Sequence, residues 1–259
     1  MFTHKNPIFF FVFLSLLLIM QSAVAQQIDT RLVIRPQAHD AKFIGSMMGG
    51  VSITIKDSET GNILDKGIAR GNTGDTQKLM MQPHERYMEL SSSGASKYAT
   101  TLSLEKPTKV TVIAEGPLAQ PEAAVKVSKE LWLIPGEHIE GDGIIMKMPG
   151  FVVDIVSSSA PDAVGISEDG IPVTAKIVMM CGCPTSEGGL WDSSEFTIKG
   201  LVSKEGEKLS EFPLSFTGNQ SIFEGVFNPE SPGNYDITVY AFDPRTGNTG
   251  VGKTTISVR

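Results

Sequence analysis

The sequence predicts an all-β protein that folds as two β-sandwich domains. Short runs of β-branched residues, or of alternating apolar and polar residues, recur along most of the chain. Turn sequences rich in glycine, asparagine and threonine separate these runs, as at residues 59–62. Pro149-Gly150 interrupts the pattern near the middle of the chain. We therefore expect an N-terminal all-β domain over residues 26–150 and a C-terminal β-sandwich domain over residues 151–259.

The first 25 residues have the organisation of a secretory signal peptide. Lys5 precedes an apolar block at residues 8–20, and small residues at positions 23–25 come directly before Gln26. This organisation predicts cleavage before Gln26 and a periplasmic or secreted mature chain, in preference to a retained N-terminal anchor. No later apolar run approaches the roughly 18 residues of a membrane helix, so we expect no membrane insertion after cleavage.

Composition argues against several classes of function. Without the signal peptide, whose only charged residue is Lys5, the chain has 21 basic and 29 acidic residues and a net charge of −8. An acidic balance argues against nucleic acid or an anionic membrane surface as a partner. Two cysteines are too few to frame a fold, and the remaining 234 residues can bury a core without them. A protein partner stays open, and the sequence does not identify one.

Several strands are expected in the N-terminal domain from β-branched or alternating runs. They cover residues 28–34, 51–55, 98–104, 110–115 and 125–133. A further run places Ile144, Met146 and Met148 on one face of a strand. Residues 83–90 and 121–129 each begin with proline followed by an early acid, and we expect them to form short helices.

Seven strands are expected in the C-terminal domain, and their turn-marked spacing is typical of an antiparallel sandwich. They cover residues 151–157, 171–180, 195–203, 208–216, 221–227, 234–242 and 254–258.

Residues 232–241 carry a more specific pattern. Pro232-Gly233-Asn234-Tyr235 leads into an alternating strand, and a loop at residues 243–250 leads to the last strand. In these features the C-terminal domain resembles an immunoglobulin-like domain, whose penultimate strand begins with a tyrosine corner. The resemblance implies an immunoglobulin-like sandwich but no particular function. The penultimate strand has no cysteine, so the disulfide that joins the two sheets of antibody domains is not expected.

Both cysteines lie in a Met-Met-Cys-Gly-Cys-Pro segment, residues 179–184, at the end of the second strand of this domain. Alternation along the strand directs Met179 toward the core and leaves Met180 exposed. In the immunoglobulin-like strand order, the following loop lies at the end of the sandwich that receives the first domain. We therefore expect the Cys-Gly-Cys loop at the junction between domains, where ligand sites are often built.

Three interpretations of Cys181 and Cys183 stay open. In an oxidising compartment they can form a local disulfide that shapes the loop. As thiolates they can bind a soft metal such as copper, with Met180 or Met179 as a further ligand. They can also exchange disulfides with a substrate, or remain free thiols.

Two residues close to the loop can fold over the cysteines. We expect Trp191 to be a core anchor and Asp192 to be a turn or cap acid rather than a general base.

Other motifs indicate little assembled chemistry. Residues 247–254 match the phosphate-loop pattern G-x-x-x-x-G-K-T, but strand-like sequence follows where such a loop needs a helix. The histidines after the signal peptide are scattered at positions 39, 84 and 138, without a zinc motif or a Ser-His-Asp set. We therefore expect no enzymatic activity.

These observations favour an exported, non-enzymatic binding protein whose site is the Cys-Gly-Cys loop. A copper ion bound by Cys181, Cys183 and Met180 or Met179 is the leading hypothesis, and it is the one cofactor that the sequence suggests. The first alternative is a structural, adhesive or protein-interaction module braced by a disulfide. The second is an exported thiol-disulfide oxidoreductase.

Overall fold

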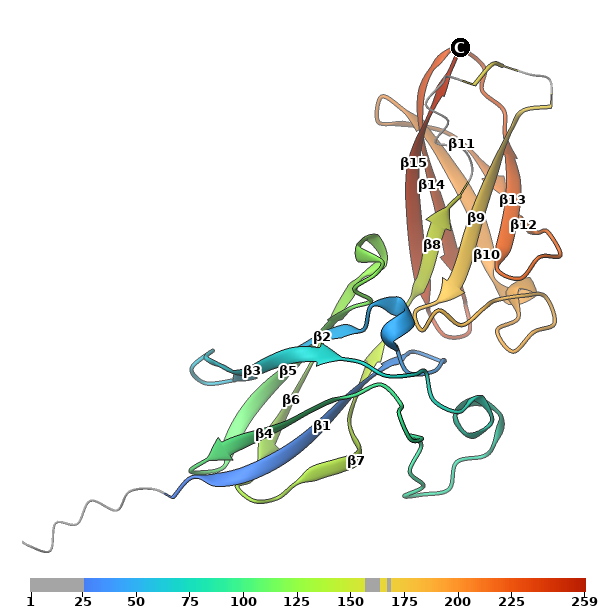
Figure 1. Cartoon of the computed structure of the whole chain (residues 1–259). Helices are drawn as coiled ribbons and strands as arrows, with labels where there is room; N and C mark the ends of the chain where they lie inside the picture. Colours follow the sequence, from blue (N-terminus) through green and yellow to red (C-terminus); the bar gives the residue numbers. More distant parts are fainter. Residues whose placement is uncertain (1–25, 157–163, 167–168) are drawn as a thin grey trace, which may run out of the picture.

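A computed structural model describes residues 26–156, 164–166 and 169–259 of the protein. The expected signal peptide, residues 1–25, lies outside the described residues. The chain forms two β-sandwich domains that lie end to end, with the C-terminus at the far end of the second (Figure 1). The predicted all-β fold class is therefore confirmed. Within the described residues, no helix is long and apolar enough to cross a membrane.

Two sheets form the first domain. One has the strand order β4-β1-β7, and the other has the order β3-β2-β5-β6. Their strands are β1 (Ile28–Ala38), β2 (Val51–Asp57), β3 (Ile63–Ala69), β4 (Tyr98–Leu104), β5 (Thr108–Gly116), β6 (Val125–Leu133) and β7 (Ile139–Met148). Strands β1 and β7 pair in parallel. Because β7 leads directly into the second domain, this pairing also brings the end of β1 to the domain junction.

Alternating apolar side chains fill the space between these sheets. In β2, Val51, Ile53 and Ile55 are fully buried, and they share the inner face of their sheet with Val110 and Val112 of β5. Burying a side chain of this size contributes about 1.5–3 kcal/mol. Strand β7 buries the three side chains of its predicted inner face, so the alternation expected over residues 144–148 is confirmed.

The expected helices of the first domain are wrong. Residues 83–90 form an irregular loop, and one turn of helix, η2 (Gln77–Met81), comes before it. The loop's backbone is bound by tertiary contacts instead, since the Asp142 carboxylate accepts hydrogen bonds from the amides of Leu90 and Ser91, both at 2.7 Å. In the second segment only η3 (Pro121–Ala123) is helical, because β6 begins at Val125 and pairs with β5.

The second domain also contains two sheets, with strand orders β12-β13-β9-β8 and β11-β10-β14-β15. Their strands are β8 (Phe151–Ile155), β9 (Ile171–Met179), β10 (Thr197–Lys204), β11 (Glu207–Pro213), β12 (Ser215–Phe216), β13 (Ile222–Phe227), β14 (Gly233–Phe242) and β15 (Thr249–Val258). In immunoglobulin lettering the first sheet takes the places of strands D, E, B and A, and the second those of C′, C, F and G. The second domain is therefore an immunoglobulin-like β-sandwich.

A tyrosine corner lies at the start of β14, where the chain enters this strand from the preceding loop. The hydroxyl of Tyr235, at the start of β14, donates a hydrogen bond of 2.7 Å to the carbonyl of Ser231. The ring is buried and lies edge-on against Phe227, with 5.0 Å between the ring centroids. This is the contact that the sequence pattern at residues 232–241 predicts, and it fixes where β14 enters the sandwich.

We expect Tyr235→Phe to lower the free energy of unfolding of the second domain by about 1 kcal/mol, the usual value of one net hydrogen bond. The measurement is urea unfolding at neutral pH. Tyr240→Phe is the matched control, since this half-buried tyrosine lies on the same strand and its hydroxyl makes no hydrogen bond to the described residues. Equal effects of the two substitutions would show that the corner hydrogen bond does not stabilise the domain.

Candidate functional site

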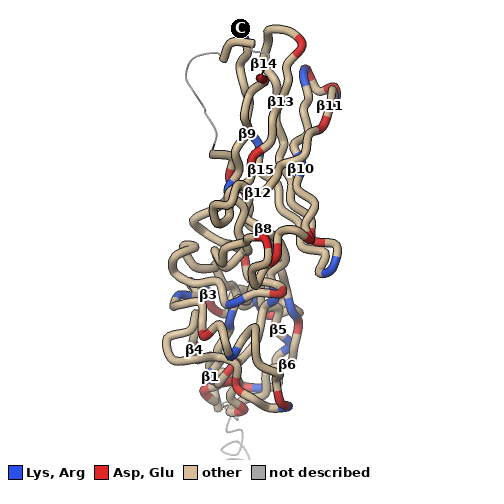
Figure 2. Tube along the Cα trace, turned by 90° about the vertical axis from the view of Figure 1, so that its right-hand side faces the viewer, with Lys and Arg blue, Asp and Glu red and all other residues tan. Residues whose placement is uncertain are grey.

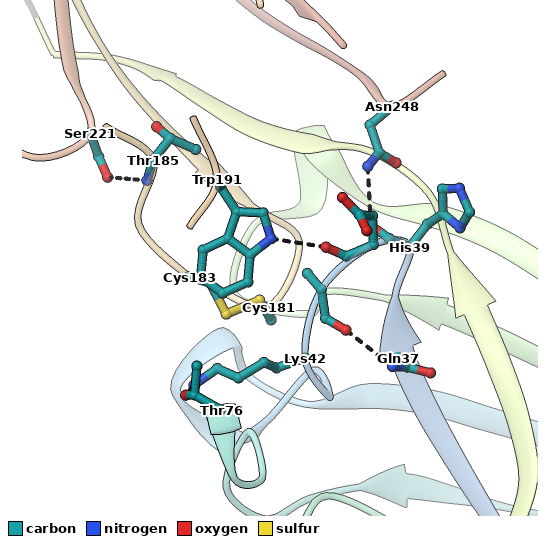
Figure 3. Close-up of a disulfide and its surroundings, with 12 residues drawn as sticks. Gln37, His39, Lys42, Thr76, Cys181, Cys183, Thr185, Trp191, Ser221 and Asn248 are labelled. Carbon is teal, nitrogen blue, oxygen red and sulfur yellow. Dashed lines mark hydrogen bonds between the residues drawn. A yellow bond between two sulfur atoms is a disulfide. The ribbon is translucent and has the colours of Figure 1, made fainter. Parts of the chain in front are cut away.

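Two side chains of the second domain hold the junction between the domains. Asn248, fully buried just before β15, accepts a 2.8 Å hydrogen bond from the amide of Gly150 and donates one of 3.0 Å to the carbonyl of His39. The indole Nε1 of Trp191 donates to the carbonyl of Asp40 at 2.9 Å (Figure 3). The turn that follows β1 is thus bound by two separate loops of the second domain.

The Cys-Gly-Cys loop lies at this junction, at the end of β9. Cys181 and Cys183 are joined by a disulfide. The amide of Gly182 donates to the carbonyl of Met179 at 2.7 Å, and the amide of Met179 donates to the carbonyl of Cys183 at 3.0 Å. Gly182 has a φ of 76°, a left-handed conformation in which a Cβ is unfavourable. Of the three interpretations of the cysteines, the structure therefore contains the disulfide.

Side-chain hydrogen bonds fix the chain where it leaves the loop. The hydroxyl of Thr185, a fully buried residue, donates to the carbonyl of Ile177 at 2.7 Å. The amide of Thr185 donates to the hydroxyl of Ser221 at 3.2 Å. These bonds, together with an antiparallel bridge between Val178 and Pro184, hold both ends of the loop independently of the disulfide.

A cleft of ≈ 390 Å³ opens beside the disulfide, between the two domains. Its walls are Lys42, Met47, Met48, Thr73 and Gln120 from the first domain, and Val152, Asp154, Lys176, Val178 and residues 181–184 from the second. The cleft has apolar walls with a few charged groups at defined positions, which is the usual composition of a ligand site at a domain interface.

The two methionines before the loop are both core residues. Met179 is 1% exposed on the inner face of β9, as its place in the alternation predicts. The expectation that Met180 is exposed is wrong, because its exposed fraction is 0%. Its Sδ lies 3.6 Å from the point that a Cβ on Gly150 would occupy, so the linker between the domains covers it. Neither methionine lines the cleft.

Two other methionines line the cleft, and the sequence did not connect them with the cysteines. Met47 and Met48 belong to η1 (Ser46–Met48) of the first domain. The Sδ of Met48 lies 2.7 Å from the point that a Cβ on Gly182 would occupy. Because Gly182 has no side chain, the thioether of Met48 from the other domain can lie against it. The two residues are far apart in the sequence, so motif spacing could not indicate this contact.

Trp191 and Asp192 have positioning roles. Trp191 is buried, and its indole bonds to the first domain as described above. The carboxylate of Asp192 accepts hydrogen bonds from the hydroxyl and amide of Ser194 and from the amide of Gly188, which lower the pKa of Asp192. It is the N-cap of the short helix η4 (Ser193–Glu195), in agreement with the cap role expected for it.

The loop that carries Asn248 is organised by a buried carboxylate. Burial alone would raise the pKa of Asp243, but hydrogen bonds from the amide and Nε of Arg245 and the hydroxyl of Thr246, with the charge of Arg245, lower it below the usual value. This loop overlaps the phosphate-loop pattern. The residues after it form β15 rather than a helix, so the pattern belongs to a β-hairpin.

The described residues offer little for a hard metal ion or for catalysis. Among them, no group of three or more His, Cys, Asp or Glu side chains is placed to hold a metal. His84 contacts the carbonyl of Lys78 at 2.9 Å, and His138 accepts a hydrogen bond from the amide of Arg31 at 3.2 Å. Neither histidine lines the cleft, whereas four sulfur-containing residues do.

Comparisons with known proteins identify no family. No family model matches the chain, and no curated protein matches it. Similar solved structures include fibronectin(III)-like modules of Clostridium thermocellum CbhA, with 9% identity, 89% of this chain and 94% of that chain covered, and a TM-score of 0.27. A three-domain immunoglobulin segment of titin has 15% identity, covers 91% and 66% of the two chains, and has a TM-score of 0.23.

An engineered protein has 18% identity and a TM-score of 0.28, covering 49% of this chain and 24% of its own length. TM-scores this low identify neither a family nor a function. The order of the strands in the sheets is therefore the evidence for the class of protein, which is a two-domain all-β protein with an immunoglobulin-like second domain.

We expect Asn248→Ala to lower the free energy of unfolding by about 3 kcal/mol, because it leaves the buried amide of Gly150 and the carbonyl of His39 without partners. Urea unfolding followed by tryptophan fluorescence measures this, since Trp132 and Trp191 report on one domain each. The control is Asn234→Ala, an exposed asparagine of β14. If Asn248→Ala loses no more unfolding free energy than the control, the hydrogen bonds of Asn248 do not stabilise the junction.

We also expect Asp243→Asn to reduce the acid sensitivity of folding. The folded-state pKa of Asp243 is depressed, so its contribution is present above the unfolded value of about 3.9 and is lost as the pH falls through the folded value. Unfolding free energies of the variant and of the wild type, measured between neutral pH and about pH 2, should therefore converge in acid. Asp154→Asn, at an exposed position, serves as the control. Parallel pH curves for the wild type and Asp243→Asn would refute this role.

Proposed function

We propose that the chain is an exported, non-enzymatic binding protein, periplasmic or secreted, and that its ligand is a soft metal ion, copper(I), taken up in the interdomain cleft when the disulfide is reduced. The observation that carries the proposal is the cleft lining. Both cysteines line the same cavity of ≈ 390 Å³ as Met48, whose Sδ lies beside Gly182. Thiolate and thioether sulfurs are the ligands that select copper(I) over harder cations.

Binding requires a defined redox step. An external dithiol supplies two electrons and two protons, the Cys181–Cys183 bond opens to two thiols, and the dithiol becomes a disulfide. Copper(I) then displaces the two thiol protons and binds the thiolates. In the disulfide form neither cysteine has a thiolate to offer, so copper affinity should depend on the oxidation state.

Several features support binding rather than catalysis. Among the described residues no group of three or more His, Cys, Asp or Glu side chains is placed to hold a metal ion, and the strongly hydrogen-bonded Asp192 and Asp243 organise turns. In the view of Figure 2, Lys and Arg residues are interspersed with Asp and Glu residues over both domains. No basic stripe stands out among the described residues in this view, and such a stripe is the electrostatic footprint of nucleic-acid binding.

The alternative is a structural or protein-interaction module in which the disulfide is only a brace. Burial favours this alternative, since Cys181 is 2% and Cys183 is 4% exposed. The second alternative, a thiol-disulfide oxidoreductase, would use the same opening of the Cys181–Cys183 bond to exchange with a substrate disulfide.

The test is copper(I) titration against the chromogenic chelator bathocuproine disulfonate, under argon. We expect about one equivalent of copper(I) to bind the protein reduced with dithiothreitol and desalted, and none to bind the oxidised protein or a reduced Cys181→Ser variant. Circular dichroism of the reduced protein checks that the fold persists. Equal binding by all three samples, or by none, would refute metal binding at the cysteines. The disulfide would then be a structural brace. Reduction of insulin disulfides by the reduced protein, with dithiothreitol as the electron source, tests the exchange activity.

A further inference from the structure

The geometry points to Met48 of the first domain, in place of Met179 or Met180, as the third sulfur ligand of copper(I) in the reduced loop. This inference rests on the proposed function and goes beyond it, because it makes the metal site span both domains. The first domain would then be part of the site rather than a neighbour of it.

The position of the Met48 thioether carries the inference. Its Sδ lies against Gly182, 2.7 Å from the place of a Cβ on that glycine. Gly182 stands between the two cysteines, and the three residues of the Cys-Gly-Cys loop line the cleft together with Met48. Thiolates released from the disulfide would therefore have a thioether beside them without any movement of the domains.

The methionines adjacent in sequence are excluded by their surroundings. Met179 packs on the inner face of the sandwich, in the row of Val173 and Ile177. Met180 lies beneath the linker, next to Gly150. Moving either thioether into the cleft would open a cavity in a close-packed core, which is destabilising.

The backbone around Met48 is held before any metal binds. Its carbonyl accepts a hydrogen bond of 3.0 Å from the amide of Ala119, and its amide donates to the carbonyl of Gly45 at 3.1 Å. Ser46 is bound on the other side, where its amide donates to the carbonyl of Gly71 at 2.8 Å. The backbone that carries the ligand therefore needs no further ordering when the side chain binds, which is one part of preorganisation.

The charges in the cleft agree with the ligand set. Copper(I) bound to two thiolates and a thioether has a net charge of −1. The cleft contains two lysines, Lys42 and Lys176, and one carboxylate, Asp154. The surplus positive charge favours binding of an anionic complex in the cleft.

The experiment compares four full-length proteins in the reduced, desalted form: the wild type, Met48→Leu, Met180→Leu and Met47→Leu. Leucine conserves volume and removes the sulfur. Copper(I) affinity is measured by competition with bathocuproine disulfonate, and X-ray absorption at the copper edge counts the sulfur ligands. We expect Met48→Leu to weaken binding by roughly tenfold or more and to reduce the sulfur count from three to two. The two control variants should bind as the wild type does.

Met47→Leu is the closest control, since Met47 lies on the same turn and is 94% exposed. If Met48→Leu binds like the wild type while Cys181→Ser does not bind, the cross-domain ligand is refuted and the proposed function survives. If Met180→Leu is the variant that loses affinity and one sulfur, the third ligand is Met180 and the inference is wrong. If the reduced wild type binds no copper, the proposed function and this inference fail together.

Discussion

The side-chain amide of Asn248 is the constraint on which the relation between the two domains depends. An amide has one acceptor and one kind of donor, and here each is used for a different part of the junction. The acceptor holds the linker at Gly150, and the donor holds the turn after β1 at His39. Because Asn248 and Gly150 are buried and the bond to His39 is partly buried, separating the domains would leave polar groups without partners, at about 1–3 kcal/mol for each buried group. The walls of the cleft are thereby fixed relative to one another.

Parallel pairing of β1 with β7 explains why this contact is available. Strands β1 and β7 end together, with Ala38 opposite Met148, so the turn at His39 and Asp40 is carried to the second domain. The immunoglobulin-like order brings the Asn248 and Trp191 loops to the same end of the second sandwich. The topology of each domain thus determines which loops meet, and the side chains then determine how tightly they do so.

How far the sequence could predict this arrangement depended on the range of the interactions. Strands with one buried face, such as β4 and β6, were predicted to the residue because alternation is a local signal. Strand β3 (Ile63–Ala69) was missed, since its less exposed positions are Asp65, Gly67 and Ala69 and the sequence therefore has no apolar alternation there. The tyrosine corner was predicted because Tyr235 and Ser231 are neighbours in sequence.

The candidate site was only partly predictable for the same reason. The cysteine pair and the left-handed glycine between them follow from local sequence. The burial of Met180 was not predictable, because it depends on a linker 30 residues away that folds back over the end of β9. The approach of Met48 depends on the docking of a different domain. A flexible thioether can serve equally as core filling or as a ligand, and only its surroundings decide between the two.

The oxidation state changes the chemistry of the loop more than its position. A disulfide stabilises chiefly by restricting the unfolded chain, and a bridge that closes only three residues restricts it least, by about 1.5 kcal/mol in the chain-entropy treatment. The loop is also held by the hydrogen bonds of Thr185 and by the amides of Met179 and Gly182, none of which needs the sulfur-sulfur bond. Reduction would therefore leave the loop in place, and under the proposed function it would turn the two sulfurs of a brace into ligands beside the thioether of Met48.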